Sequence, residues 1–284
     1  MQPARDAGYR RGVEAAAAPR APGLRGQAWL LGVLLVLAFV AWIFTDERMG
    51  GMDAGPGTDV GSLGFYTTTW VVMMAAMMFP SIAPMVLTYR RVQTGRVRLG
   101  REVQGGTTSA FVAGYLVAWT AFGLAAYGVV AGVQSLSIGA LAWDRAGRWL
   151  VVGVLLAAAA YQLTPAKDAC LTRCRSPLDF LMERWRDGRA GALRLGALHG
   201  MWCVGCCWGL MAALFALGVM SLGWMAFLAA VIAGEKLLPW KRLAMRATAV
   251  LLAALGLGVA TAPADVPGLT IPRHAAMGTG SRNP

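Results

Sequence analysis

The sequence predicts an all-α membrane protein: a polytopic transmembrane helical bundle of about seven spans, or six, with the N-terminus in the cytoplasm. Hydrophobic residues make up 57% of the 284 residues, charged residues only 14%, and the mean hydropathy is +0.55. About a quarter of the residues of a typical soluble domain are charged, so this composition excludes a soluble domain. The second observation is a series of apolar runs separated by short basic connections, which is typical of membrane spans.

Seven apolar runs reach or approach the roughly 20 residues that a helix needs to cross a bilayer. In chain order they cover residues 28–44, 65–89, 109–133, 148–163, 196–220, 222–238 and 248–262. No long soluble domain and no clear internal repeat interrupts the series, so we expect one bundle over residues 28–262. Residues 1–27, rich in Ala, Arg, Pro and Gly, predict a disordered cytoplasmic tail, and residues 263–284 a flexible C-terminal tail.

The basic residues predict the orientation of the bundle. In the seven-span arrangement, 21 of the 26 Lys and Arg residues lie on one side of the membrane and five on the other. The positive-inside rule makes the basic side cytoplasmic. A net charge of +12 would suggest nucleic acid in a soluble domain, but here membrane lipid is the expected partner and nucleic acid is not. We expect a multi-pass protein of the cell membrane, which in a bacterium is the inner membrane.

The fifth run carries the most informative cluster. Imidazole, thiol and thioether groups stand at i, i+4, i+7, i+8 and i+12 of the predicted helix, and therefore on one stripe: His199, Cys203, Cys206, Cys207 and Met211. This soft ligand set suits copper(I) best and zinc next. The alternative is that buried cysteines serve only as small hydrophobic residues.

The second run carries four methionines that form two pairs at i, i+4 spacing: Met73 with Met77, and Met74 with Met78. Each pair presents two thioethers on one helix face, and the middle of the run is predicted at the depth of the cysteines. Methionine is also a flexible filler of apolar cores, so packing is the alternative. Whether the methionine and cysteine clusters meet is left open.

Three further residues are candidate ligands. Glu235 ends the sixth run, and an ionisable group inside a membrane helix is a functional candidate; a salt-bridged helix end is the alternative. Cys170 and Cys174 stand four residues apart in the basic connection between the fourth and fifth runs. If that segment is helical, the two thiols share a face and could bind one soft ion.

These residues carry a family resemblance. The motifs are WxxMxxAMMxPSxxPM at residues 70–85, YQLTPxK with CxxxCRSP at 161–177, HGxxCxGCCW at 199–208 and EKLLP at 235–239. Over residues 70–239 the chain resembles the family described as predicted metal-binding integral membrane proteins. The resemblance implies a copper-handling role, with the motif residues as ligands or as supports of ligands.

The leading hypothesis is therefore a protein that handles, delivers or transports copper(I) through a Cys/His/Met site within the bundle. Its expected partners are the metal ion and a copper-dependent membrane oxidase or a metallochaperone. No nucleotide-binding or zinc-protease motif is present, and no catalytic residue is assigned; the sequence favours a role other than catalysis. Two alternatives stay open: a membrane thiol-disulfide oxidoreductase using Cys203 and Cys206, and an assembly subunit of a membrane oxidase.

Overall fold

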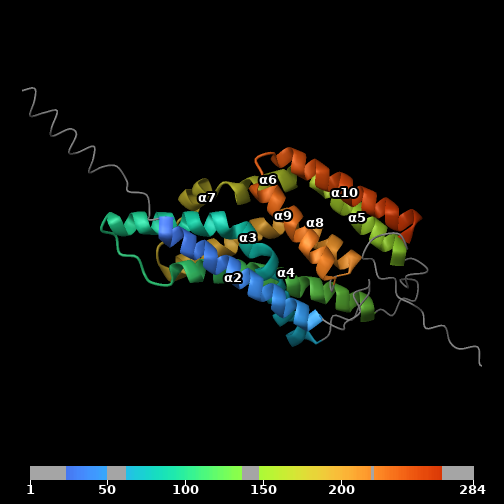
Figure 1. The fold of residues 1–284 in the computed structure, drawn as a ribbon, viewed down its shortest axis with the longest axis horizontal. Helices are drawn as coiled ribbons and strands as arrows, with labels where there is room; N and C mark the ends of the chain where they lie inside the picture. Colours follow the sequence, from blue (N-terminus) through green and yellow to red (C-terminus); the bar gives the residue numbers. More distant parts are fainter. Residues whose placement is uncertain (1–23, 50–61, 136–146, 219–220, 264–284) are drawn as a thin grey trace, which may run out of the picture.

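The computed structural model describes residues 24–49, 62–135, 147–218 and 221–263, and over these ranges it contains helices and no strand. The predicted fold class is confirmed. The predicted tails lie outside the described residues, apart from residues 24–27 and 263. In chain order the helices of Figure 1 are α2 (Leu24–Met49), α3 (Leu63–Arg98), α4 (Thr107–Ser135), α5 (Arg148–Gln162), α6 (Pro165–Arg175), α7 (Pro177–Arg184), α8 (Gly188–Leu217), α9 (Leu222–Leu237) and α10 (Lys241–Thr261).

Five of the described helices are long and apolar enough to cross a membrane: α2, α3, α4, α8 and α10. Helix α5 meets that condition only together with α6, from which it is bent by 64°. Helix α9 has 16 residues, or about 24 Å at 1.5 Å per residue, which is shorter than a hydrocarbon core of about 30 Å. Length and composition therefore give five or six spans among the described helices, and the count of seven stays a prediction.

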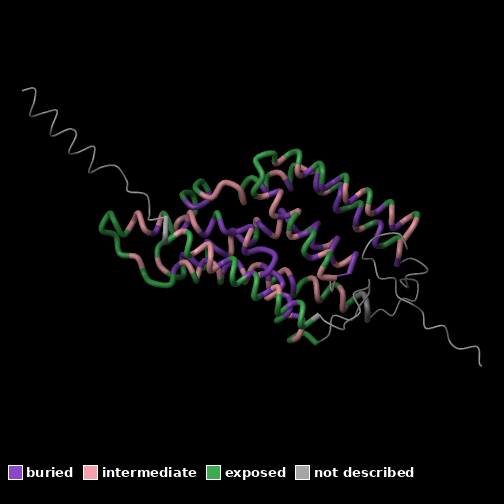
Figure 2. Tube along the Cα trace, viewed as in Figure 1, coloured by how far each residue is buried: buried purple, intermediate pink, exposed green. Residues whose placement is uncertain are grey.

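The outer helices expose large apolar side chains. On α2, Trp29, Phe39 and Val40 are each more than half exposed, and on α10 the same holds for Val250 and Leu257. Soluble monomers rarely expose continuous apolar surface of this kind, whereas lipid tails are as apolar as leucine. Figure 2 shows that the buried residues, in contrast, are concentrated along the middle of the bundle.

Helix α8 forms the centre of the packing, with α4 along its N-terminal half and α5 and α6 along its C-terminal half. Glycines permit the close approach. A Cβ on Gly196 would lie 1.9 Å from the carbonyl oxygen of Phe111 in α4, and a Cβ on Gly205 would lie 2.8 Å from the sulfur of Cys170 in α6. Small residues of this kind are how membrane helices bring their backbones together. Gly196 thereby brings α4 against α8 two turns before Cys203, and Gly205 brings α6 against the cysteine-bearing middle of α8.

Two ion pairs join basic connections that the predicted orientation puts on the same side of the membrane. Arg96 near the end of α3 donates to Asp187, the residue before α8, at 2.5 Å. Lys241 at the start of α10 pairs with Asp168 of α6 at 2.6 Å. The first pair joins the end of α3 to the connection before α8, and the second joins the start of α10 to α6 in the connection after α5. This is the arrangement that the predicted orientation requires, and the sidedness itself stays a prediction.

Candidate metal centre

Three cysteines of α8 converge at the middle of the bundle. Cys203, Cys206 and Cys207 stand at i, i+3 and i+4, so the helix places them on one face. Their sulfurs all lie within 4.8 Å of one another, and Cys206 Sγ is 3.4 Å from Cys207 Sγ. Each residue is at most 1% exposed. We call these three residues the cysteine group; it is the sequence-predicted cluster without His199 and Met211.

A fourth thiol reaches the group from α6. Cys174 Sγ lies 3.8 Å from Cys206 Sγ, and Cys174 is half-buried where the cysteine group is fully buried. Cys170, one turn earlier on α6, lies against Gly205 of α8 and is also half-buried. The segment that carries both thiols is helical, as their spacing allowed. Of the two, Cys174 is the one within hydrogen-bond contact of the group.

The local sequence explains why α6 begins where it does. Thr164 precedes the helix in an extended conformation, and its hydroxyl accepts a hydrogen bond from the backbone N–H of Lys167 at 3.2 Å. Pro165 occupies the first helical position, where its missing N–H costs nothing. The cap and the proline end α5 and redirect the chain, which turns α6 back against α8.

A buried ion pair lies beside the group. Lys167 Nζ of α6 and Glu235 Oε2 of α9 are 2.7 Å apart, and their side chains are 1% and 2% exposed. Lys167 also donates to the carbonyl oxygen of Cys206, and Arg175 donates to the carbonyl oxygen of Glu235 at 2.6 Å. Glu235 is thus a salt-bridged residue, but its partner comes from another helix and the pair is buried.

Cys203 has two polar neighbours from two other helices. Lys236 Nζ of α9 donates to its sulfur at 2.9 Å, and the hydroxyl of Tyr115 in α4 lies 3.0 Å from the same sulfur. Lys236 also donates to Ser81 Oγ of α3 at 3.3 Å. Helices α3, α4, α8 and α9 therefore meet around this one thiol.

His199 lies one turn before Cys203 and is surrounded by aromatic rings. Its ring centroid is 5.4 Å from that of Phe180, 6.0 Å from that of Tyr115 and 6.2 Å from that of Phe111. The residue is 3% exposed, and its Nδ1 has no hydrogen-bond partner among the described residues. The structure places the imidazole in this aromatic enclosure and outside the cysteine group, so its role as a ligand stays a prediction.

The candidate methionines are all buried. Ser81 connects the methionine-bearing stretch of α3 to the cysteine group: its hydroxyl donates to the carbonyl oxygen of Met78 at 2.9 Å, lies 3.9 Å from the Met78 sulfur, and accepts from Lys236. The two clusters thus approach one another through Ser81 and Lys236. The remaining candidates pack in the same apolar core at no more than 1% exposure: Met73, Met74, Met77 and Met211.

The sulfur spacing fits a single soft metal ion. With metal–sulfur bonds of about 2.3 Å, sulfurs lie about 3.8 Å apart in tetrahedral coordination and about 4.0 Å apart in trigonal coordination. The distances of 3.4 Å between Cys206 and Cys207 and 3.8 Å between Cys174 and Cys206 need only small side-chain adjustments to match. Soft thiolates select Cu(I), Zn(II) and iron–sulfur clusters.

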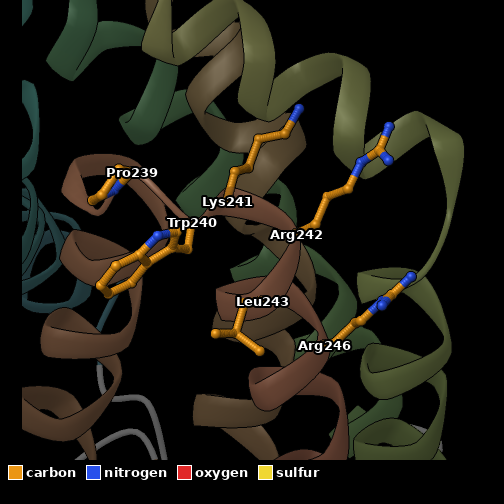
Figure 3. Close-up of a pocket in the computed structure, with 6 residues that line it drawn as sticks. All are labelled: Pro239, Trp240, Lys241, Arg242, Leu243 and Arg246. Carbon is orange, nitrogen blue, oxygen red and sulfur yellow. The ribbon is translucent and has the colours of Figure 1, made fainter.

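The pocket of Figure 3 lies elsewhere, at the turn from α9 to α10, and Arg242 and Arg246 extend to the same side of it. Its lining contains no cysteine, histidine or methionine: Pro239, Trp240, Lys241, Arg242, Leu243 and Arg246. It is therefore not the metal centre.

Three residues at the centre were not among the sequence-predicted ligands: Lys167, Lys236 and Tyr115. The two lysines adjoin predicted candidates, since Lys236 follows Glu235 and Lys167 precedes Cys170 by three residues. A lysine next to apolar runs is usually assigned to the membrane surface. For this reason neither lysine was predicted to lie at the metal centre. No feature of the sequence marked Tyr115 as part of the centre, because only the packing of α4 on α8 brings it to Cys203.

Comparison with known proteins agrees with this chemistry. Residues 67–259, more than half of the chain, match the PpoB2 family, which is described as a copper chaperone. The matched range includes all five cysteines, the methionines of α3 and the two lysines beside the cysteine group, Lys167 and Lys236. Neither the curated proteins nor the solved structures provided a match. The chain therefore belongs to the PpoB2 copper chaperone family, and its cysteine group supports a copper-related metal-binding role.

Proposed function

We propose that the protein holds Cu(I) within a membrane bundle and hands it to an acceptor protein, with Cys203, Cys206 and Cys207 as the site that carries the ion. The observation behind this is the convergence of three buried thiols within 4.8 Å in a copper chaperone family member. Three thiolates satisfy Cu(I), whereas structural zinc sites normally take four protein ligands. Zinc binding at the same sulfurs, with Cys174 as fourth ligand, is a weaker alternative.

Cys174 is the ligand through which the ion enters or leaves. It is the least buried of the four neighbouring sulfurs and stands on a short helix. Cu(I) moves by ligand exchange: a bond to Cys174 forms before a bond to one of the α8 sulfurs breaks, so the ion is never released free.

The methionine thioethers extend the proposed copper-transfer route beyond the cysteine group, on the side away from Cys174. Met78 is connected to the cysteine group through Ser81 and Lys236, and thioethers bind Cu(I) weakly enough to exchange it. Met73, Met74, Met77 and Met211 are further candidates for this relay, and His199 and Glu235 for supporting positions. A series of exchangeable ligands suits transfer better than a closed site does.

The exposed apolar surface supports the location that we propose. The exposed apolar faces of α2 and α10 support a multi-pass protein of the cell membrane. The acceptor is a protein that needs copper, either a copper-dependent membrane oxidase or a soluble metallochaperone. Transfer along ligands of graded affinity needs no catalytic residue.

The test is an anaerobic Cu(I) titration of the purified protein in lipid nanodiscs against a chromophoric chelator. Wild-type protein should withdraw one equivalent of Cu(I) from the chelator, and the variant C203S/C206S/C207S should withdraw none. Cys170→Ser is the matched control, because it removes a thiol outside the cysteine group. Equal binding by the triple variant and wild type would overturn the assignment.

A second function, thiol-disulfide exchange, is favoured by one distance: Cys174 Sγ and Cys206 Sγ approach to 3.8 Å across two helices, in addition to the predicted pair of Cys203 and Cys206. A redox role predicts that the protein purified from cells carries a reversible disulfide, seen as an electrophoretic shift after thiol alkylation. A metal-free protein with such a shift would favour exchange. A metal-free protein without it that co-purifies with an oxidase would favour an assembly subunit.

A further inference from the structure

The two lysines beside the cysteine group, Lys167 buried and Lys236 half-buried, differ in their countercharge. Lys167 pairs with the Glu235 carboxylate at 2.7 Å, so that pair is neutral. Lys236 forms no ion pair with a carboxylate among the described residues. Its ammonium group instead contacts Cys203 Sγ at 2.9 Å and Ser81 Oγ at 3.3 Å.

A cation inside an apolar bundle is stable only beside a compensating anion. Of the two atoms that Lys236 contacts, the hydroxyl of Ser81 stays neutral, whereas the sulfur of Cys203 is an anion whenever it serves as a metal ligand. The charge that compensates Lys236 is therefore supplied by the cysteine group itself.

The same requirement for charge compensation applies to the cysteine group with Cu(I) bound. Cu(I) held by three thiolates carries a net charge of −2, and held by two it carries −1. Both cases place an uncompensated charge among residues that are at most 1% exposed. One adjacent ammonium group offsets one unit of this charge, and the Lys167–Glu235 pair offsets none.

Given the proposed function, on which this step rests, we propose that Lys236 is the counter-cation of the copper site and that its charge permits a third sulfur to join the ion. With the ammonium group in place, Cys203, Cys206 and Cys207 hold Cu(I) together. Without it, the three-sulfur form loses its compensation and the ion falls back to two sulfurs. Lys236 acts through Cys203 and is a positioning residue.

The experiment compares three variants in nanodiscs. Lys236→Met keeps the length and removes the charge, Lys236→Arg keeps the charge, and Lys241→Met removes a lysine whose partners are Asp168 and Thr172, away from the sulfurs. The readouts are the number of sulfurs around copper, from X-ray absorption fine structure, and the Cu(I) affinity from chelator competition.

Wild type, Lys236→Arg and Lys241→Met should each show three sulfurs. Lys236→Met should show two, with an affinity lower by about 10- to 100-fold, the usual cost of losing a residue that supports a ligand. If Lys236→Met does not insert as a folded protein, Lys236→Gln makes the same comparison.

Three sulfurs and unchanged affinity in Lys236→Met would overturn the inference and leave the proposed function intact. A wild-type protein that binds no copper, or a cysteine triple variant that still does, would instead contradict the proposed function. A merely structural lysine would change thermal stability and leave the sulfur count at three.

Discussion

Cys174 stands on a different helix from the three sulfurs it adjoins and is the most exposed of the four. A ligand in that position affects the rate at which Cu(I) is exchanged more than it affects how much Cu(I) the protein retains. We predict that Cys174→Ser keeps one Cu(I) per chain but passes it to a soluble chelator more slowly, by on the order of tenfold, which corresponds to ~1.4 kcal/mol in the barrier. Stopped-flow transfer measures this, with Cys170→Ser as the comparison, and equal rates for wild type and Cys174→Ser would contradict the role.

The Lys167–Glu235 pair makes a prediction about stability. Glu235→Gln leaves a buried ammonium group without its countercharge, which costs about 3–5 kcal/mol when one partner of such a pair is removed. The double variant Lys167→Met with Glu235→Leu should recover most of that loss, because an apolar pair of similar volume needs no compensation. Unfolding in mild detergent measures both. A single variant as stable as the double one would show that the pair is not compensating a buried charge.

At the residue scale, the spacing of the α8 cysteines was enough to predict that they share a face, because helical periodicity fixes it. The approach of Cys174 to Cys206 was not predictable, since it depends on the 64° bend between α5 and α6. The pairing of Lys167 with Glu235 was not predictable either, because the two residues are 68 positions apart in the sequence.

Helix α8 holds its position through glycines, and this gives a prediction at the scale of elements. A Cβ on Gly196 would lie 1.9 Å from the Phe111 carbonyl oxygen, whereas a Cβ on Gly153 in α5 would meet nothing within 4 Å. Gly196→Ala should therefore destabilise the protein by about 1–3 kcal/mol, the usual cost of overpacking, and Gly153→Ala should not destabilise it. Thermal unfolding of the two variants separates them, and matching melting temperatures would contradict the α4–α8 packing.

The sequence located the long helices well, because their apolar runs are long and continuous. It assigned residues 164–195 to a connection, where the structure has α6, α7 and the first turns of α8. The signals for α6 were present in Thr164 and Pro165, which cap and begin a helix. The amphipathic composition of such short helices resembles that of a loop, so hydropathy alone did not separate them.

For the whole molecule, the distribution of Lys and Arg among the connections predicts which side of the membrane each connection faces. In a background with the native cysteines replaced by serine, Arg101→Cys and Arg186→Cys should both be protected from a membrane-impermeant maleimide added to intact cells. Asp46→Cys, near the C-terminal end of α2 and on the predicted outer side, should be labelled. The positive-inside rule gives this direction, and labelling of Arg101→Cys from outside would reverse the orientation.

The central claim is that the cysteine group holds copper, and metal content tests it most directly. The measurement is inductively coupled plasma mass spectrometry of protein purified under reducing conditions from cells supplied with copper and zinc. Wild type should contain nearly one copper per chain with little zinc, and C203S/C206S/C207S should contain none while inserting normally. Metal-free wild-type protein, or copper that persists in the triple variant, would contradict the claim.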